Sequence, residues 1–492
     1  MNADIYIGID MGSTGLKAVA FDGESGWSLA ASGAALPFIH LPGGGCELGA
    51  EAIEGALMQA LRSVASQLGP RVAAVRALSC TGHGAGLYAL DARHRLLRAR
   101  AVASIDQRAS ARARALAQQL GAQLFEEVGC RPWSGQPTLI AAELLATGAM
   151  QRGAVHRLLF AKDYLGLLLT GEPSTDASDV GTAGLLALDT GACSMRAFDA
   201  AGLSELAGTL APIVPGGAVI GTLLPERAGS CGLPAGLPVA ASAIDLLASL
   251  MAVGAPQRGQ AVAVLGTWCV NAVIDSVREP KPAVGAIVNF GVAGQRLYLE
   301  NSPSSMANVA WLARTLGLHG AAQVLDCALS VPLGAQGLRF LPFINGGSVP
   351  EGVAAGFIGL RPQHGRAHMA RAVVDAVAAL HARHLGRLAS CGLGVRTRVA
   401  ALGGGARDVR LVRLIASFLG HPVARCGDDE TGARGAALYA AMSQGASMPA
   451  PSFERVAHDA QDANACADYY GGFLKLVESM PPVCAHIAEP GQ

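Results

Sequence analysis

An aspartate, a turn of small residues and a lysine follow one another near the start of the chain. Asp10 follows an alternating apolar run from Ile5 to Ile9 that is typical of a strand, and a Gly-Ser-Thr turn leads through Lys17 into a second strand-like run. Such a turn gathers backbone N–H groups and hydroxyls around one point, which favours a phosphate. A carboxylate can serve that phosphate through Mg²⁺, which binds one or two carboxylates together with substrate phosphates. The segment predicts nucleotide chemistry, although a plain hairpin with a glycine-rich turn shares the pattern.

A second carboxylate stands alone in an apolar run. Asp245 lies within residues 242–248, whose sequence Ser-Ala-Ile-Asp-Leu-Leu-Ala favours a helix. An aspartate at such a place can cap the helix. It can also act as a general base whose pKa is tuned by the apolar surroundings. Both interpretations remain open at this point.

Two further turns of small residues follow apolar, strand-like runs. Gly266-Thr267 comes after residues 262–265, and three glycines, 403–405, come after residues 399–402. Glycine allows a backbone to approach a ligand closely. Each turn can therefore contact a phosphate, and each can equally be an ordinary tight turn.

Asp106 and Arg108 are spaced for joint contact with one ligand. They follow a strand-like run at 101–103, and in an extended segment two residues at this spacing face the same way. Both side chains can hydrogen-bond sugar hydroxyls. A solvated ion pair in a loop is the alternative, and the segment alone favours that alternative.

Two common motifs are absent from the sequence. They are His-Glu-x-x-His of zinc-dependent proteases and Gly-x-x-x-x-Gly-Lys-Ser/Thr of the nucleotide-binding P-loop. Two histidine pairs, His364 with His368 and His381 with His384, have metal-compatible spacing. Since no carboxylate partner is evident, we expect these histidines to be exposed or to cap helices.

Composition narrows the class of protein. The 492 residues predict two or more domains, and 51% hydrophobic with 15% charged residues excludes global disorder. Lys plus Arg and Asp plus Glu are each 37, so the balanced charge argues against a nucleic-acid binder.

Eleven cysteines without a Cys-x-x-Cys pair favour free thiols in a reducing cytosol. The first residues do not resemble a signal peptide and no apolar run is long enough for a bilayer, so we expect a cytoplasmic protein without a membrane partner.

Alternating helix and strand patterns predict an α/β protein with two halves. Helices are expected over residues 51–68, 107–121, 367–389, 409–419 and 432–443, and strands over 72–78, 262–265 and 399–402. The Gly- and Pro-rich residues 212–238 are expected to separate the halves, with 232–238 as the best linker. Residues after 444 are expected to form a less regular tail that ends in an amphipathic segment. Two such halves would bring their small-residue turns to one cleft.

Taken in chain order, these elements resemble the FGGY family of carbohydrate kinases over roughly residues 5 to 445. The segments that carry the resemblance are IGIDMGSTGLKAVAFD, TGHGAGLYALD, SIDQRA, KDYLGLLLTGEPSTDASD, SAIDLLAS, VLGTW, ALGGGARD and DDETGARGAALYAA. The resemblance implies two ribonuclease-H-like (actin-like ATPase) α/β domains flanking a deep catalytic cleft. It implies a sugar-binding N-terminal domain over 1–240 and an ATP-binding C-terminal domain over 241–492.

The resemblance also implies a role for each matching residue. Asp10 would hold Mg²⁺, directly or through water, and Asp245 would take the proton from the attacking sugar hydroxyl. Substrate contacts are implied for His83, Gly84, Asp106, Arg108 and Asp245. Contacts to ATP are implied for Thr14, Lys17, Gly266, Thr267, Gly404, Gly405 and Asp408. This set suits phosphoryl transfer by positioning and charge neutralisation.

The implied activity is ATP-dependent phosphorylation of a sugar hydroxyl. Ser104, Trp268 and the stretch over 341–385 are similar to the L-xylulose kinase branch, so a ketopentose such as L-xylulose is the first expectation. Erythritol, D-xylulose, 3-keto-L-gulonate and glycerol are the alternatives among kinase substrates. The oligomeric state stays open, a homodimer included.

Two other classes of protein share the fold. A sugar- or nucleotide-binding regulator is one, but a pure binder needs neither Asp10 nor Asp245. A chaperone-like ATPase is the other, but it would need a peptide-binding domain for which no residues are left over.

Overall fold

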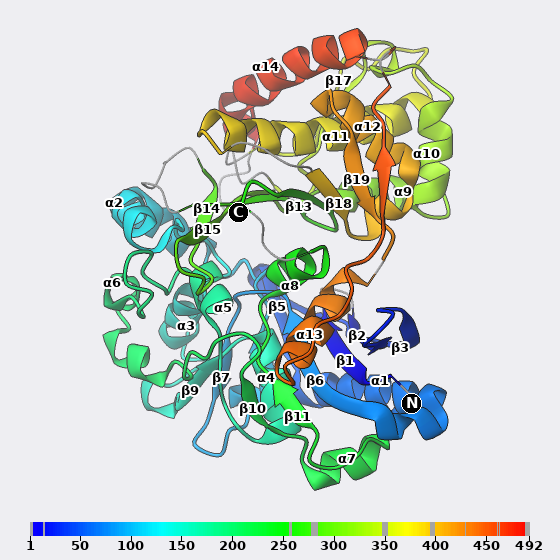
Figure 1. Ribbon diagram of the computed structural model, residues 1–492. Coiled ribbons are helices and arrows are strands. Elements are labelled where there is room, and N and C mark those ends of the chain that lie inside the picture. Colours follow the sequence, from blue (N-terminus) through cyan, green and yellow to red (C-terminus); the bar gives the residue numbers. More distant parts are fainter. Residues whose placement is uncertain are drawn as a thin grey trace.

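The computed structural model describes residues 3–12, 15–254, 258–276, 284–346, 353–393, 399–428, 430–459, 461 and 463–487. Figure 1 shows two lobes, the first built from the N-terminal half of the chain and the second from most of the C-terminal half. Each lobe is organised around a mixed sheet with helices packed on it, which confirms the predicted α/β class.

The first lobe contains a six-stranded sheet in the order β10-β11-β6-β1-β2-β3. Its strands are β1 (Ile5–Met11), β2 (Gly15–Asp22), β3 (Ser28–Ala35), β6 (Val75–Gly82), β10 (Val219–Thr222) and β11 (Pro238–Ala240). The central strand β1 runs antiparallel to β2 and parallel to β6. Ile5, Ile7 and Ile9 are fully buried in the core, which α1 (Ala50–Leu68) covers with its own apolar face. Every residue of β1 except Asp10 is buried, as expected of a central strand that is covered on both faces.

Smaller elements complete the first lobe. Two minor sheets contain β4 (Ile39–Leu41), β5 (Gly45–Gly49) and β8 (Arg100–Val102), and β7 (Tyr88–Leu90) with β9 (Arg157–Leu159). The helices are α2 (Ser110–Val128), α3 (Pro137–Ala146), α4 (Ala161–Thr170), α5 (Ala177–Thr182), α6 (Met195–Ala200) and α7 (Pro225–Cys231). The next helix, α8 (Asp245–Ala252), packs against the second lobe instead, since Leu247 and Leu250 share a core cluster with Val262 of its sheet.

The second lobe contains a seven-stranded sheet in the order β14-β15-β13-β12-β18-β19-β20. Its strands are β12 (Ala261–Leu265), β13 (Cys269–Ser276), β14 (Ala286–Val288), β15 (Gln295–Ser302), β18 (Val399–Leu402), β19 (Val423–Cys426) and β20 (Phe453–Val456). A separate pair consists of β16 (Arg339–Leu341) and β17 (Gly356–Ile358). The helices are α9 (Met306–Thr315), α10 (Ala321–Leu329), α11 (Arg366–Ser390), α12 (Val409–Leu419) and α14 (Ala463–Ile487). The long helix α11 is buried along much of its length in the core of this lobe.

One helix of the C-terminal half returns to the first lobe. α13 (Thr431–Met442) packs on β1 and α8, and Figure 1 shows it in orange below the second sheet. A Cβ atom built at Gly8 would overlap the carbonyl oxygen of Ala433, and one at Gly435 would overlap the backbone of Ala248. Glycine is required at both positions because the backbones approach each other so closely.

The structure confirms the helices expected from the sequence and corrects three other expectations. The expected linker over 212–238 belongs to the first lobe instead, since β10 and β11 pair there and α7 lies between them. The expected irregular tail contributes the edge strand β20 to the second sheet before α14 begins. The strand expected at 72–78 begins later, at Val75, because a 3-10 helix occupies residues 69–74. The domain division at residue 240 stays a prediction.

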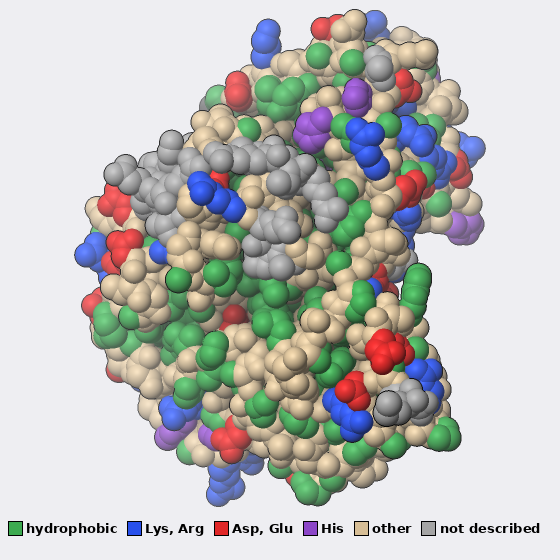
Figure 2. Space-filling model, in the orientation of Figure 1, with side chains coloured by type: hydrophobic (Ala, Val, Ile, Leu, Met, Phe, Trp, Pro, Cys, Tyr) green, Lys and Arg blue, Asp and Glu red, His purple; other side chains and the backbone are tan. Residues whose placement is uncertain are grey.

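The surface and the cysteines agree with the composition. Figure 2 shows basic and acidic side chains interspersed over both lobes of this face, without one large basic patch. All eleven cysteines are free thiols, and most are buried. Among the helices that the structure describes, none is long and apolar enough to cross a membrane.

Candidate active site

Asp10 lies near the end of β1, opposite Lys17 of β2. Its Oδ1 is buried and accepts no hydrogen bond within the part of the chain that the structure describes. The pKa of Asp10 is raised to about 6, mainly by burial and also by the charge of Glu430, while the charge of Lys17 lowers it. A Cβ atom at Gly432 of α13 would overlap Oδ2, so only glycine fits beside this carboxylate.

An orphaned carboxylate oxygen of this kind fits a divalent cation. Hard cations prefer oxygen ligands, and Mg²⁺ commonly uses one or two protein carboxylates with substrate phosphates supplying others. Within the described ranges, no cluster of three or more His, Cys, Asp or Glu residues could hold a metal. Asp10 therefore suits a cation that arrives with a phosphate ligand. Thr14, expected beside it, lies outside the described residues.

Asp245 is the first residue of α8, and its side chain is partly buried. The pKa of Asp245 is raised to about 7, mainly by burial and also by the charge of Asp10, while a hydrogen bond from the Leu246 N–H (2.6 Å) lowers it. α13 runs beside both residues, since Gly432 meets the Asp10 carboxylate and Gly435 meets the backbone of Ala248 in α8. A carboxylate with a pKa near 7 is suited to general base catalysis at neutral pH.

Two hydroxyls fix the backbone that leads into Asp245. Thr81 Oγ1 donates to the Ala243 carbonyl (2.6 Å), and the Ile244 N–H donates to Ser178 Oγ (3.0 Å). Thr81 belongs to β6 and Ser178 to α5, so two elements of the first lobe position the base.

His83 and Gly84 form the turn that follows β6. The His83 N–H donates to the Met11 carbonyl at the end of β1 (3.1 Å). A Cβ atom at Gly84 would lie 3.2 Å from Thr182 and 3.3 Å from Ile244, next to the base. The structure therefore brings the predicted residues His83, Gly84 and Asp245 together.

Several buried polar atoms around this turn lack a hydrogen-bond partner within the described ranges. They are both ring nitrogens of His83, Tyr88 OH and Thr182 Oγ1. Burial lowers the pKa of His83 to about 4, so its imidazole is neutral. Since buried polar groups normally have partners, these atoms suit a ligand that carries several hydroxyls.

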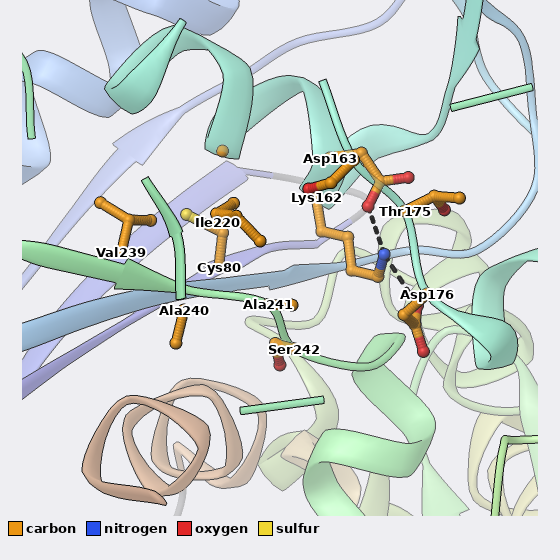
Figure 3. A pocket seen from close by; sticks show the side chains of 12 residues that line it. Cys80, Lys162, Asp163, Thr175, Asp176, Ile220, Val239, Ala240, Ala241 and Ser242 are labelled. Carbon is orange, nitrogen blue, oxygen red and sulfur yellow. Dashed lines mark hydrogen bonds and ion pairs between the residues drawn. The ribbon is translucent and has the colours of Figure 1, made fainter. Parts of the chain in front are cut away.

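A buried charge cluster lies behind this turn, and sequence reasoning did not assign it a function. The Lys162 ammonium of α4 pairs with Asp163, Asp176 (2.9 Å) and Asp179 (3.4 Å). Figure 3 shows the ammonium between Asp163 and Asp176, at one side of a small pocket. All four side chains are buried, so the three carboxylates depend on the one cation.

The charge cluster also holds the loop beside the site. Asp176 caps α5 by accepting the Ser178 N–H (2.8 Å), and Asp179 Oδ1 accepts the Ala85 N–H (3.2 Å). The only sequence signal for this arrangement was the segment 162–179 within the family resemblance, because spacing alone does not show that Lys162 and Asp179 meet.

Asp106 and Arg108 form a partly buried ion pair, so the expectation of a solvated pair is wrong. Asp106 is fully buried and accepts the Cys46 N–H (2.7 Å) and the Arg108 guanidinium (2.7 Å). Arg108 also donates to Glu47 of β5 (2.9 Å). Both side chains therefore bind the 104–108 loop to β5, and their direct contact with a substrate stays a prediction.

The two glycine turns of the second lobe lie side by side. β12 and β18 are parallel neighbours, so Gly266-Thr267 and residues 403–405 follow adjacent strand ends. Gly403 has a φ of +84°, and a Cβ there would lie 3.1 Å from the Leu265 carbonyl. Gly404 is exposed with open space beside it, and Gly405 is buried against Leu265. The arrangement leaves backbone groups of both turns at one rim.

Glu430 connects the turns of the two lobes. Its carboxylate binds the Lys17 ammonium (2.8 Å) and lies 3.6 Å from the Arg407 guanidinium. Arg407 ends the short 3-10 helix that contains Gly404 and Gly405. Glu430 thus links the predicted residue Lys17 of the first lobe to the residue that follows the glycine turn of the second lobe.

Asp408 has a different structural role. It caps α12 by accepting the Arg410 N–H (3.0 Å) and binds the Arg410 guanidinium through both oxygens. Its contact with ATP stays a prediction. His381 and His384 are neither exposed nor capping, contrary to expectation, since both are buried in the core of the second lobe.

Comparison with known proteins agrees with this geometry. Residues 5–252 match the N-terminal domain of the FGGY family of carbohydrate kinases, and residues 261–444 match its C-terminal domain. The chain is 26% identical over 445 residues to L-xylulose/3-keto-L-gulonate kinase of Escherichia coli, covering 89% of this chain and 88% of the relative. It is 29% identical over 449 residues to xylulose kinase of the same organism, covering 89% and 90%. The crystal structure of xylulose kinase from Rhodospirillum rubrum superposes with a TM-score of 0.84 at 23% identity, covering 98% and 100%.

Proposed function

The chain belongs to the FGGY family of carbohydrate kinases, and we propose that it transfers the γ-phosphoryl group of Mg·ATP to a hydroxyl of a ketopentose, first of all L-xylulose. One observation carries this proposal: a partly buried carboxylate with a raised pKa, Asp245, stands beside a group of buried polar atoms without protein partners. The ketopentose is favoured by similarity over most of both chains to a relative whose name includes L-xylulose.

Asp245 is the proposed general base. As the sugar oxygen bonds to the γ-phosphorus, the bond from that phosphorus to the β,γ-bridging oxygen breaks and ADP leaves. The proton of the sugar hydroxyl goes to Asp245. Thr81 and Ser178 fix the backbone on the N-terminal side of the base, so its carboxylate needs little rearrangement to reach the hydroxyl.

Asp10 is the proposed Mg²⁺ ligand, because its Oδ1 is orphaned and no Cβ lies over its Oδ2. When bound, Mg²⁺ would neutralise charge on the phosphates. The backbone of Gly266-Thr267 and of residues 403–405 would donate to the phosphates, with Lys17 nearby at Glu430. Phosphate contact by these residues is part of the proposal.

The sugar would lie against the turn that follows β6. A neutral imidazole donates one hydrogen bond and accepts one, so His83 can hold two hydroxyls. Thr182 lies against Gly84 and the Tyr88 ring lies near the His83 ring, and each offers a buried hydroxyl without a protein partner in the described structure. This set contains no cation aimed at the ligand, and it favours a neutral polyhydroxylated substrate.

A sugar acid is the second candidate substrate, because the name of the same relative also includes 3-keto-L-gulonate. Rates of ADP release with L-xylulose, D-xylulose, 3-keto-L-gulonate, erythritol and glycerol, at saturating Mg·ATP, decide between them. We expect the highest kcat/KM with L-xylulose. A higher value with 3-keto-L-gulonate would establish the second candidate, and a higher value with erythritol or glycerol would overturn the ketopentose proposal.

A further inference from the structure

A group of polar side chains is buried directly beneath the Gly266-Thr267 turn. It comprises Cys269, Asn271, Ser302, Ser305, His381 and His384, which we call the histidine network. Each of these residues is at most 1% exposed, and they come from β13, the end of β15, the start of α9 and the middle of α11. Burying so many polar groups in a core is costly unless all are paired.

Asn271 bridges the two histidines. Its Oδ1 lies 3.0 Å from His381 Nδ1, and its Nδ2 lies 3.0 Å from His384 Nδ1. An amide oxygen only accepts and an amide nitrogen only donates, so His381 carries its proton on Nδ1 and His384 carries its proton on Nε2. The amide therefore fixes both rings and both tautomers.

The remaining ring nitrogens meet serine hydroxyls. His384 Nε2 donates to Ser302 Oγ, and Ser305 Oγ donates to His381 Nε2, each at 3.1 Å. Burial lowers the pKa of His381 to about 3 and that of His384 well below its ordinary value, in keeping with two neutral rings. Every ring nitrogen has a partner, which leaves none for a metal.

Ser305 connects this network to the turn above it. The Ser305 N–H donates to the Thr267 carbonyl (2.9 Å), and the next N–H, of Met306, donates to the Gly266 carbonyl (3.0 Å). At the other end of the turn, Cys269 pairs in register with Leu265 and its Sγ lies 3.5 Å from His384 Nδ1. The network thus holds the turn at both ends.

We propose that His381 is a positioning residue for nucleotide binding, which acts through Ser305 to hold the Gly266-Thr267 turn where it meets the phosphates of ATP. Asn271 and His384 orient the His381 ring for this purpose. The inference rests on the proposed phosphate contact of that turn. If the histidine network only filled the core, it would have no need to include Ser305, whose backbone N–H binds the turn.

The test compares variants in dissociation constants for Mg·ADP and for the sugar, together with Tm. Ser305→Ala removes one hydroxyl from a buried site and keeps the backbone donors. His381→Leu removes the ring, and His381→Gln keeps an acceptor for Ser305 and a donor for Asn271. Asp375→Asn is the matched control, since Asp375 is also a buried polar residue of α11 but accepts the Gly334 N–H, away from the turn.

We expect Ser305→Ala and His381→Leu to weaken Mg·ADP binding about tenfold, as expected for one buried hydrogen bond. Sugar binding should change less than about twofold. His381→Gln should recover most of the nucleotide affinity. Asp375→Asn should lower Tm and leave both affinities unchanged.

Two results would overturn the inference. One is a lower Tm for Ser305→Ala with unchanged Mg·ADP affinity, and the other is an equal loss of nucleotide and sugar affinity. Because binding is measured directly, either result is distinct from failure of the proposed function, which would show as a wild-type chain that binds Mg·ADP but phosphorylates no sugar in the panel.

Discussion

The turns of the two lobes use their polar side chains in opposite ways. Around the end of β6, His83, Tyr88 and Thr182 keep buried polar atoms without protein partners in the described structure. Beneath the end of β12, Asn271 and His381 have every such atom paired. The first region leaves its side chains for a polyhydroxylated ligand, whereas the second uses side chains to hold backbone groups in place. A sugar differs from its competitors by individual hydroxyls, which side chains distinguish, while phosphates are met well by ordered N–H groups.

The largest effect expected of a single substitution is that of Asp245→Asn, which removes the base and keeps the shape. We expect kcat to fall about 10³-fold, within the usual contribution of a general base, with the KM for sugar nearly unchanged. Steady-state kinetics at saturating Mg·ATP measure both. Near-normal kcat would show that another group takes the proton.

Lys162→Met tests whether the first region depends on its buried charge cluster. Removing the cation leaves Asp163, Asp176 and Asp179 buried without it, so the free energy of unfolding should fall by about 3–5 kcal/mol. Urea unfolding followed by circular dichroism measures the loss. The matched control is Arg95→Met, whose exposed pair with Asp91 should contribute far less because water screens it. An equal loss of unfolding free energy in the two variants would show that the buried cluster stabilises the chain no more than an exposed ion pair does.

His83→Ala sharpens the comparison between the lobes. Losing two hydrogen bonds to the sugar should lower kcat/KM for the sugar about 100-fold and leave the KM for Mg·ATP within about twofold. Both constants are measured in the same preparation. The result is then compared with Ser305→Ala, for which we expect the opposite: weaker nucleotide binding and nearly unchanged sugar binding. If His83→Ala weakened ATP and sugar alike, the division of roles between the two turns would be wrong.

The smallest effect concerns pH. Asp245 must be deprotonated to accept a proton, and burial together with the charge of Asp10 raises its pKa to about 7. The kcat/KM for the sugar should therefore be constant above that pH and fall about tenfold for each pH unit below it. Added Mg²⁺ should move this limb to lower pH, because a cation near Asp10 offsets the charge that raises the pKa. A profile without an acidic limb between pH 5 and pH 8 would exclude this assignment.

Sequence patterns predicted the parts of the molecule that depend on local chemistry. The alternation at Ile5, Ile7 and Ile9, and the glycines after β12 and β18, indicated buried strands that end in turns, as the structure has them. The family resemblance then gathered His83 and Asp245 into one site, where the structure also brings them together.

Other features depend on contacts between distant residues and could not be read from spacing. Lys162 of α4 meets Asp179 of α5 only in the folded chain, and His381 meets Asn271 only because α11 packs on the second sheet. Residues 212–238 looked like a linker because glycine and proline are common both in linkers and at the edges of sheets, and only strand pairing distinguishes the two.

The most direct test of the account is the initial rate of ADP release from Mg·ATP with and without L-xylulose, for the wild type and for Asp245→Asn. The account predicts release that depends on the sugar, yields one phosphorylated sugar per ADP and is lost in the variant. ADP release at the same rate without sugar, or equal release by the variant, would contradict a sugar kinase with Asp245 as its base.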